Sequence, residues 1–257
     1  MTLALAMDTP PDLPNGASSS ASSYDLKVDY SKVVSFARQQ AGLPLMYGMC
    51  VTNGTTETLA GAELVIRHDP AFATSKTLRL ADLLPGGVVT LDAALLDMPL
   101  EAGFLSSQRE RTQGNLNVEL RCGETVKASA ILPLAVLAYN EWSGLADLPE
   151  VLAAFSTPNQ PSVTRLLGLA AEHLAKTTGK SALDGYQTKD PRRIFRMIEA
   201  VFLAVKEQGI VYCVPPASFE QSGQKIRFAE EVLGTHLGTC LDTTLLFTAA
   251  LEAVGLK

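Results

Sequence analysis

The stretch LGTCLDTTLLFTAALEAVG, residues 237–255, contains the clearest helix pattern in the chain. Its apolar residues recur at the three- and four-residue spacing of a helix with one buried side, namely Leu241, Leu245, Leu246, Ala249, Ala250 and Val254. Thr239 can cap the N-terminus of this helix, and Asp242, three residues later, completes an acidic capping box. Gly255 provides a C-terminal stop. The pattern therefore predicts that Cys240 lies in the first turn of a buried helix.

Two interpretations of Cys240 follow from this position. The unpaired N–H groups and the positive dipole end of a helix N-terminus favour a thiolate over a thiol, which makes Cys240 a candidate nucleophile. Cysteine is also among the residues most often simply buried, and reactivity requires exposure and a base in addition. The sequence leaves both interpretations open.

Composition limits the possible partners of the chain. The 257 residues contain 47% hydrophobic and 19% charged residues, which is typical of a globular protein with a substantial core. The net charge of −6 and the lack of any Lys/Arg run argue against direct nucleic-acid binding by this segment. No apolar stretch approaches the roughly 20 residues of a membrane span, so we expect no membrane partner.

The cysteines are widely spaced, at Cys50, Cys122, Cys213 and Cys240. No CxxC pair and no histidine at metal-ligand spacing accompanies them, so we expect no metal site and no cofactor in this chain. The N-terminus, beginning MTLALAM, lacks basic residues and is too short for a signal peptide. These features favour a reducing, cytoplasmic location.

The N-terminal half of the chain has the pattern of a β-protein. Residues 1–23 are rich in Pro and Ser and predict a disordered tail. Residues 24–140 then show period-two alternation and turn signals, with strands expected at 24–30, 43–52, 59–68, 88–91, 116–120 and 126–139. Pro133 in the last segment indicates an edge or a bulge. Such short strands predict an immunoglobulin-like β-sandwich.

Residues 141–257 have a mainly helical pattern. Helices are expected at 149–155, 163–177 and about 228–233, and Asp190-Pro191 is a strong start for another that ends at Gly209. That helix should bury a face formed by Ile194, Met197, Ile198, Val201, Phe202 and Val205. Residues 210–214 predict a short strand. The overall prediction is an α+β protein with a β-sandwich domain at 24–140 and a helical domain at 141–257.

Several polar residues have structural interpretations that we prefer over functional ones. Arg192, Arg193 and Arg196 are expected on a solvated helix face rather than in an anion site. His173 is expected to be a partly buried structural histidine. His236 precedes Cys240 by four residues but gives little reason to act as its base, because a base also needs hydrogen-bond reach and a third orienting group.

The chain resembles a known family over most of residues 24–257, and five separated motifs carry the resemblance. They are LAYNEW (137–142), DGYQ (184–187), PPASFE (215–220), GQKIR (223–227) and GTCLD (238–242). Together they resemble a domain of unknown function that opens very large bacterial proteins of the superfamily 1 DNA helicase type. The placement of Cys240 at a helix N-terminus also resembles the first half of a transglutaminase-like (papain-like) core.

The resemblance implies two functions. In the first, the chain is an accessory or regulatory N-terminal module, partnered by helicase domains downstream in the same polypeptide or in a partner protein. The full-length protein then resembles an ATP-dependent DNA helicase, while these 257 residues contain no phosphate-binding loop.

In the second function that the resemblance implies, the chain is the first half of a transglutaminase-like cysteine hydrolase or acyltransferase. Cys240 would be its nucleophile, with the His and Asp partners beyond residue 257. We therefore expect the chain to be a fragment that is inactive as it stands.

Overall fold

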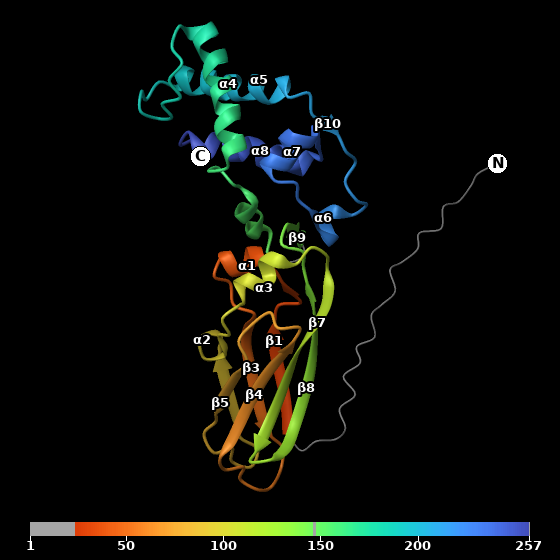
Figure 1. Ribbon diagram of the computed structural model, residues 1–257. Coiled ribbons are helices and arrows are strands. Elements are labelled where there is room, and N and C mark those ends of the chain that lie inside the picture. The colour runs from red at the N-terminus through yellow and green to blue at the C-terminus, as the bar shows by residue number, and fades with distance from the viewer. Residues whose placement is uncertain (1–23, 146–147, 257) are drawn as a thin grey trace, which may run out of the picture.

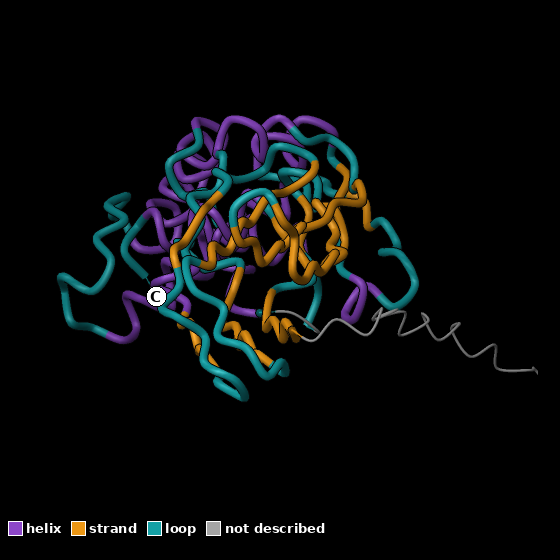
Figure 2. The backbone as a smooth tube through the Cα atoms, turned by 90° about the horizontal axis from the view of Figure 1, so that it is seen from below, coloured by secondary structure: helices purple, strands orange, loops and turns teal. Residues whose placement is uncertain are grey.

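The computed structural model describes residues 24–145 and 148–256 and has an α+β fold of two parts. The expected tail at 1–23 lies outside the described residues. Figure 1 shows the strands gathered at one end of an elongated molecule and the longer helices at the other. Seen from below in Figure 2, the strand end lies in front of the helices. We call residues 24–140 the strand part and residues 141–256 the helical part.

The strand part consists of two sheets. One has the order β1–β3–β6, formed by Tyr24–Tyr30, Met46–Asn53 and Val88–Asp92, and all of its pairs are antiparallel. The other has the order β2–β8–β7–β4–β5, formed by Val33–Val34, Thr125–Val136, Thr112–Cys122, Ala62–Asp69 and Lys76–Arg79. Only β2 pairs in parallel in this sheet. Three short helices lie between strands: α1 (Phe36–Gln40), α2 (Ala93–Leu96) and α3 (Ala102–Ser107).

The two sheets share one hydrophobic core. Val51 and Met49 enter it from the first sheet, and Leu64, Leu116 and Val118 enter it from the second. Alternating residues of β7 and β8 face this core, as period-two patterning requires. The register of β7 with β8 runs from Thr112↔Val136 to Cys122↔Thr125, with one shift at Leu120/Arg121. The alternation that predicted strands therefore reflects one buried and one solvated face.

In the strand part, the expected strands exist, but most of their ends differ and two strands were missed. The strand expected at 43–52 begins at Met46, and the one expected at 59–68 begins at Ala62. The strand expected at 126–139 ends at Val136, and the chain turns at 139–140. Pro133 lies on a stretch of β8 that β2 leaves unpaired, because β2 pairs only at Ala135 and Val136. Strands β2 and β5 were missed because two and four residues are too few to show a periodic pattern.

The helical part contains four helices that share a second core. They are α4 (Pro161–Thr178), α5 (Pro191–Glu207), α7 (Ala229–Thr235) and α8 (Cys240–Ala253), and the 3₁₀ helix η1 (Pro149–Phe155) precedes them. Asp190 caps α5 and Gly179 ends α4 in the left-handed conformation, as the sequence predicted. Short strands complete this part: β9 (Glu141–Trp142) with β11 (Gln224–Lys225), and β10 (Val211–Tyr212) with β12 (Leu237–Gly238); α6 (Phe219–Ser222) precedes β11.

Two expectations for α5 are wrong. Phe202 was assigned to the buried face but is 57% exposed, whereas Ala200 and Ala204 are buried. Small residues let α5 approach its neighbours closely, so the buried face is centred on the alanines. Arg193 was assigned to a solvated face, but its side chain is only 12% exposed. Its guanidinium donates to Thr178 Oγ1 at 3.0 Å and to Asp184 Oδ1 at 3.3 Å, which ties the α4–α5 loop to α5.

The strand and helical parts are joined by a third small core and by ion pairs. Ala37 of α1 packs with Trp142, Phe155, Ile226 and Leu245 of the helical part. Arg111 Nη2 lies 2.7 Å from Glu141 Oε1 and donates to the Ser222 carbonyl oxygen at 3.0 Å. The neighbouring Glu110 pairs with Lys225 at 2.6 Å. The bend at 109–111 thus fastens the two parts together.

Candidate functional site

Cys240 is the first residue of α8 and is exposed. Thr239 is the N-cap, and its hydroxyl accepts a hydrogen bond from the Asp242 N–H at 3.2 Å. Asp242 Oδ2 in turn accepts from the Thr239 N–H at 2.9 Å, which completes the predicted capping box. Gly255 follows the helix with a positive φ of 76°, in agreement with the predicted stop. The backbone that carries Cys240 is therefore fixed by side chains of its own first turn.

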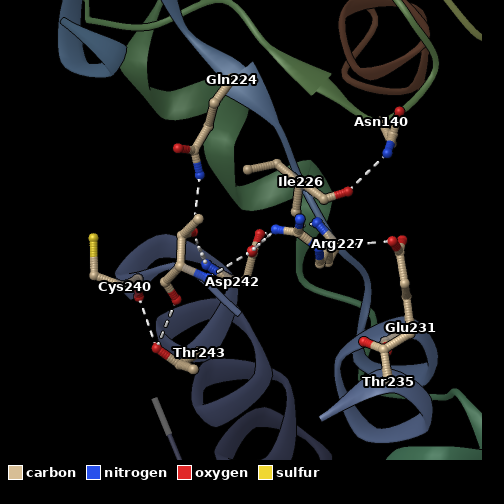
Figure 3. A network of polar contacts seen from close by, with 10 residues as sticks. Asn140, Gln224, Ile226, Arg227, Glu231, Thr235, Cys240, Asp242 and Thr243 are labelled. Atoms are coloured by element: carbon tan, nitrogen blue, oxygen red, sulfur yellow. Dashed lines mark hydrogen bonds and ion pairs between the residues drawn. The ribbon is translucent and has the colours of Figure 1, made fainter. Parts of the chain in front are cut away.

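Asp242 is fully buried and also holds a second segment of the chain. Its Oδ1 accepts from the Arg227 N–H at 2.9 Å, and its Oδ2 lies 3.1 Å from Arg227 Nη1. Figure 3 shows these contacts converging on the carboxylate beside the start of α8. A buried carboxylate is stable only when it is paired and hydrogen-bonded, and Asp242 meets both conditions. Asp242 is thus a structural anchor between α8 and the segment 224–227.

Gln224 extends this network to the N-cap. Its Nε2 donates to Thr239 Oγ1 at 3.1 Å, so the cap hydroxyl is held from two sides (Figure 3). Gln224 is also the register partner of Trp142 in the β9–β11 pair. The Gln224 Oε1 and Trp142 Nε1 atoms are both buried and have no hydrogen-bond partner among the described residues. Buried polar atoms without a hydrogen-bond partner are uncommon in folded proteins, and the β9–β11 pair contributes two of them.

Asn140 fixes the other end of β11. The Ile226 N–H donates to the Asn140 carbonyl oxygen at 2.7 Å, and Asn140 Nδ2 donates to the Ile226 carbonyl oxygen at 2.8 Å. Gly223, just before β11, has a φ of 77°, and a Cβ placed there would overlap the Trp142 carbonyl oxygen. Only glycine fits this approach. Residues 140–142 and 223–227 therefore form one closely packed strip beside α8.

Three of the five sequence motifs lie close together although they span more than a hundred residues. Motifs 137–142, 223–227 and 238–242 form the network around the start of α8. Motif 215–220 lies beside them, because Phe219 packs against the small core that contains Trp142 and Ile226. Motif 184–187 lies at the other end of α8, where a Cβ on Gly185 would be 2.6 Å from the Val254 carbonyl oxygen. The motif residues thus frame α8 at both ends.

The three histidines of the chain are engaged elsewhere. His236 caps α7 with a φ of 55°, and its Nδ1 lies 2.6 Å from the Gln208 carbonyl oxygen. His173 Nε2 lies 3.1 Å from Glu207 Oε1, which fits the structural role expected of it. His68 Nδ1 lies 2.9 Å from the Pro70 carbonyl oxygen. Within residues 24–145 and 148–256, none of these histidines contacts Cys240.

The remaining candidate groups form no composite site. Cys50, Cys122, Cys213 and Cys240 are all free thiols. The described part of the chain holds no cluster of three metal-ligating side chains. Among the described helices, none combines the length and the apolar character needed to cross a membrane.

Sequence reasoning found Cys240, Thr239 and Asp242 but gave no role to Asn140, Gln224 or Arg227. These three were present only as letters of motifs, because hydrogen bonds between residues 15 or 86 positions apart leave no periodic signal. A polar residue inside an otherwise apolar or glycine-flanked motif was the one available sign.

No family model matches this chain, and no curated protein matches it significantly.

Proposed function

We propose that this chain is an accessory module that presents the start of α8 to a larger helicase-related polypeptide, without turning over a substrate itself. The observation that carries the proposal is the convergence of three of the five resembling motifs on one network. Polar residues from 137–142, 223–227 and 238–242 are all used to fix the backbone around Thr239 and Cys240. Residues that serve to hold one surface in place are what a docking module requires.

The junction supports the same proposal. Ion pairs from Arg111 and Glu110, together with the core around Trp142, join the two parts over several elements. A module that transmits the position of one part to the other needs such a stiff connection. In this proposal the strand part is an immunoglobulin-like sandwich and the helical part is the first half of a transglutaminase-like core. The location is the cytoplasm, and the partners are helicase domains rather than nucleic acid or a membrane.

Two measurements test the accessory proposal. Purified 1–257 should hydrolyse neither ATP nor fluorogenic peptide and amide substrates above the rate of a Cys240→Ala control. Turnover that the Cys240→Ala variant abolishes would overturn it. In the source DNA, the reading frame after the codon for Lys257 should continue into helicase motifs, and a stop codon there would limit the proposal to helicase domains on a separate partner protein.

A second function is favoured by one specific observation. Cys240 is exposed at the first position of a capped 14-residue helix, where helix N–H groups can stabilise developing negative charge. In this alternative Cys240 is the nucleophile of a cysteine hydrolase or acyltransferase, and its His and Asp partners come from other segments.

Alkylation kinetics distinguish the alternative from the accessory proposal. If Cys240 is an activated nucleophile, iodoacetamide at pH 6 should modify it much faster than Cys213, which serves as an internal reference in the same chain. The Thr239→Ala variant should slow this reaction by loosening the helix start, while Thr235→Ala, at the end of α7, should not. Equal slow rates at both cysteines would contradict a catalytic Cys240.

A further inference from the structure

A cavity of about 480 Å³ lies where the strand part meets the helical part, and no sequence motif pointed to it. We call it the junction cavity. Tyr30, Lys32 and Tyr47 line it from the strand part, and Ser143, Gln221 and Ser222 line it from the helical part. Its volume falls within the range of small-molecule sites, which occur preferentially between domains. A ligand here would touch both parts at once.

The charge of the junction cavity is positive, in contrast to the chain as a whole. Lys32 and Arg111 line it, and no carboxylate side chain is among its described lining residues. Arg111 is neutralised by Glu141, because two of its nitrogens lie within 2.9 Å of Glu141 Oε1. Lys32 has no ion pair among the described residues, so the cavity presents one uncompensated positive charge in a chain of net charge −6.

The Lys32 ammonium is also held in place. It donates to Tyr30 Oη at 2.6 Å and lies 3.8 Å from the centre of the Tyr30 ring. The Tyr30 hydroxyl donates its own proton to the Pro133 carbonyl oxygen at 3.0 Å. The Tyr30 oxygen therefore accepts from Lys32, and two ammonium protons remain for a ligand. A cation fixed in this way loses less side-chain entropy on binding than a free surface lysine.

The rest of the lining combines aromatic and aliphatic side chains with the uncharged polar residues Ser31, Ser143, Gln221 and Ser222. The Tyr47 ring is 37% exposed, while its hydroxyl accepts from Arg38 Nη2 at 2.8 Å and so fixes the ring. Val33, which is half-buried, supplies aliphatic surface. A single positive charge beside an aromatic ring matches a monoanion that carries an apolar body. A phosphate dianion would leave one negative charge uncompensated, since Arg111, the other cation among the described lining residues, is already paired with Glu141.

We propose that the junction cavity binds an organic carboxylate with an aromatic or branched apolar body, with Lys32 as its anion ligand and both parts of the chain in contact with it. The carboxylate accepts charge-assisted hydrogen bonds from Lys32, and the apolar body lies against Tyr47 and Val33. Because the ligand touches Gln221 and Ser222 as well, its binding stiffens the junction. Such a ligand would be either a free metabolite or the C-terminal residue of a peptide, which share this chemistry.

Titration of the complete 1–257 chain with a matched pair of probes, followed by amide NMR, tests the proposal. Phenylacetate should give saturable shifts at 30–33, 47, 143 and 221–222, and the neutral phenylacetamide should not. Lys32→Met, which keeps the aliphatic stem, should weaken phenylacetate binding by about tenfold. Lys27→Met is the matched control, because Lys27 is an exposed lysine on β1, just before Lys32 in the chain and outside the cavity, and it should leave binding unchanged. N-acetylphenylalanine in place of phenylacetate distinguishes the two sources: tighter binding indicates a peptide C-terminus, and weaker binding a free carboxylate.

Three results would overturn the proposal. The first is equal binding of phenylacetate and phenylacetamide, which would remove the role of charge. The second is unchanged affinity in Lys32→Met with the remaining amide spectrum intact. The third is saturable binding of inorganic phosphate at the same residues with equal or higher affinity, which would indicate a different class of anion.

Discussion

The strand part and the helical part are held together by different kinds of contact. In the strand part, β7 and β8 pair continuously from Thr112↔Val136 to Cys122↔Thr125 over a core of aliphatic side chains. In the helical part, the strands beside Cys240 are two residues long, and their positions depend on Gln224, Arg227 and Asp242. The first kind of contact tolerates any residue of suitable shape, whereas the second requires particular donors and acceptors. This difference predicts which substitutions each part tolerates.

The largest effect is expected in the core of the strand part. Phe72 is fully buried there, and Phe72→Ala should lower the free energy of unfolding by about 3–5 kcal/mol, because it removes apolar contacts and leaves a cavity. Urea unfolding followed by circular dichroism measures the change. Ile131→Ala, at a 72% exposed position of β8, is the control and should stay within about 0.5 kcal/mol. Similar losses for both variants would contradict the assigned core.

Gly223→Ala should lower the free energy of unfolding of the helical part more than a conservative substitution on the surface of that part. We expect a loss of about 3 kcal/mol, because left-handed backbone strain adds to overlap of the new Cβ with the Trp142 carbonyl oxygen. Fluorescence of Trp142, the single tryptophan, reports on this contact directly during urea unfolding. Gly209→Ala has a similar φ of 62° but open space around its Cβ, so it should cost only the strain, about 1–2 kcal/mol. Equal costs would show that Gly223 and Trp142 are not in close contact.

Asp242→Asn tests the polar anchor itself. The amide keeps the shape of the carboxylate but loses the ion pair with Arg227 and one acceptor oxygen, so we expect a loss of about 2 kcal/mol. Amide hydrogen exchange should show lost protection at 224–227 and at the start of α8, with protection of β7 and β8 retained. The exposed Asp82 provides the control variant Asp82→Asn. Uniform loss of protection over both parts would mean that they unfold as one unit.

Thr239→Ala should have the smallest effect. It removes the cap hydroxyl that accepts from the Asp242 N–H and from Gln224 Nε2, at an expected cost of about 1 kcal/mol. Thr239→Ser keeps the hydroxyl and should recover most of this loss in the same urea assay. A serine variant as unstable as the alanine variant would place the contribution in the methyl group instead of the cap.

Local sequence patterns predicted much of the secondary structure. The alternation at 24–30, the Asp190-Pro191 start and the Thr239/Asp242 capping box each involve residues no more than a few positions apart, and each lies where expected. Predictions were poorer where the outcome depends on distant neighbours. Phe202 is exposed because alanines bring α5 close to its neighbours, and Arg193 is largely buried because the α4–α5 loop folds over it.

The sequence by itself determined where most of the longer helices and strands form and that Cys240 begins a helix, since hydrophobic period and capping are properties of adjacent residues. Only the tertiary structure decided what surrounds that helix start. It placed Gln224 against Thr239 and Arg227 against Asp242, kept the three histidines apart from Cys240 within the described residues, and left a positively charged cavity between the two parts. The physical reason is that these contacts join segments far apart along the chain. Their geometry is fixed only after the two cores have packed.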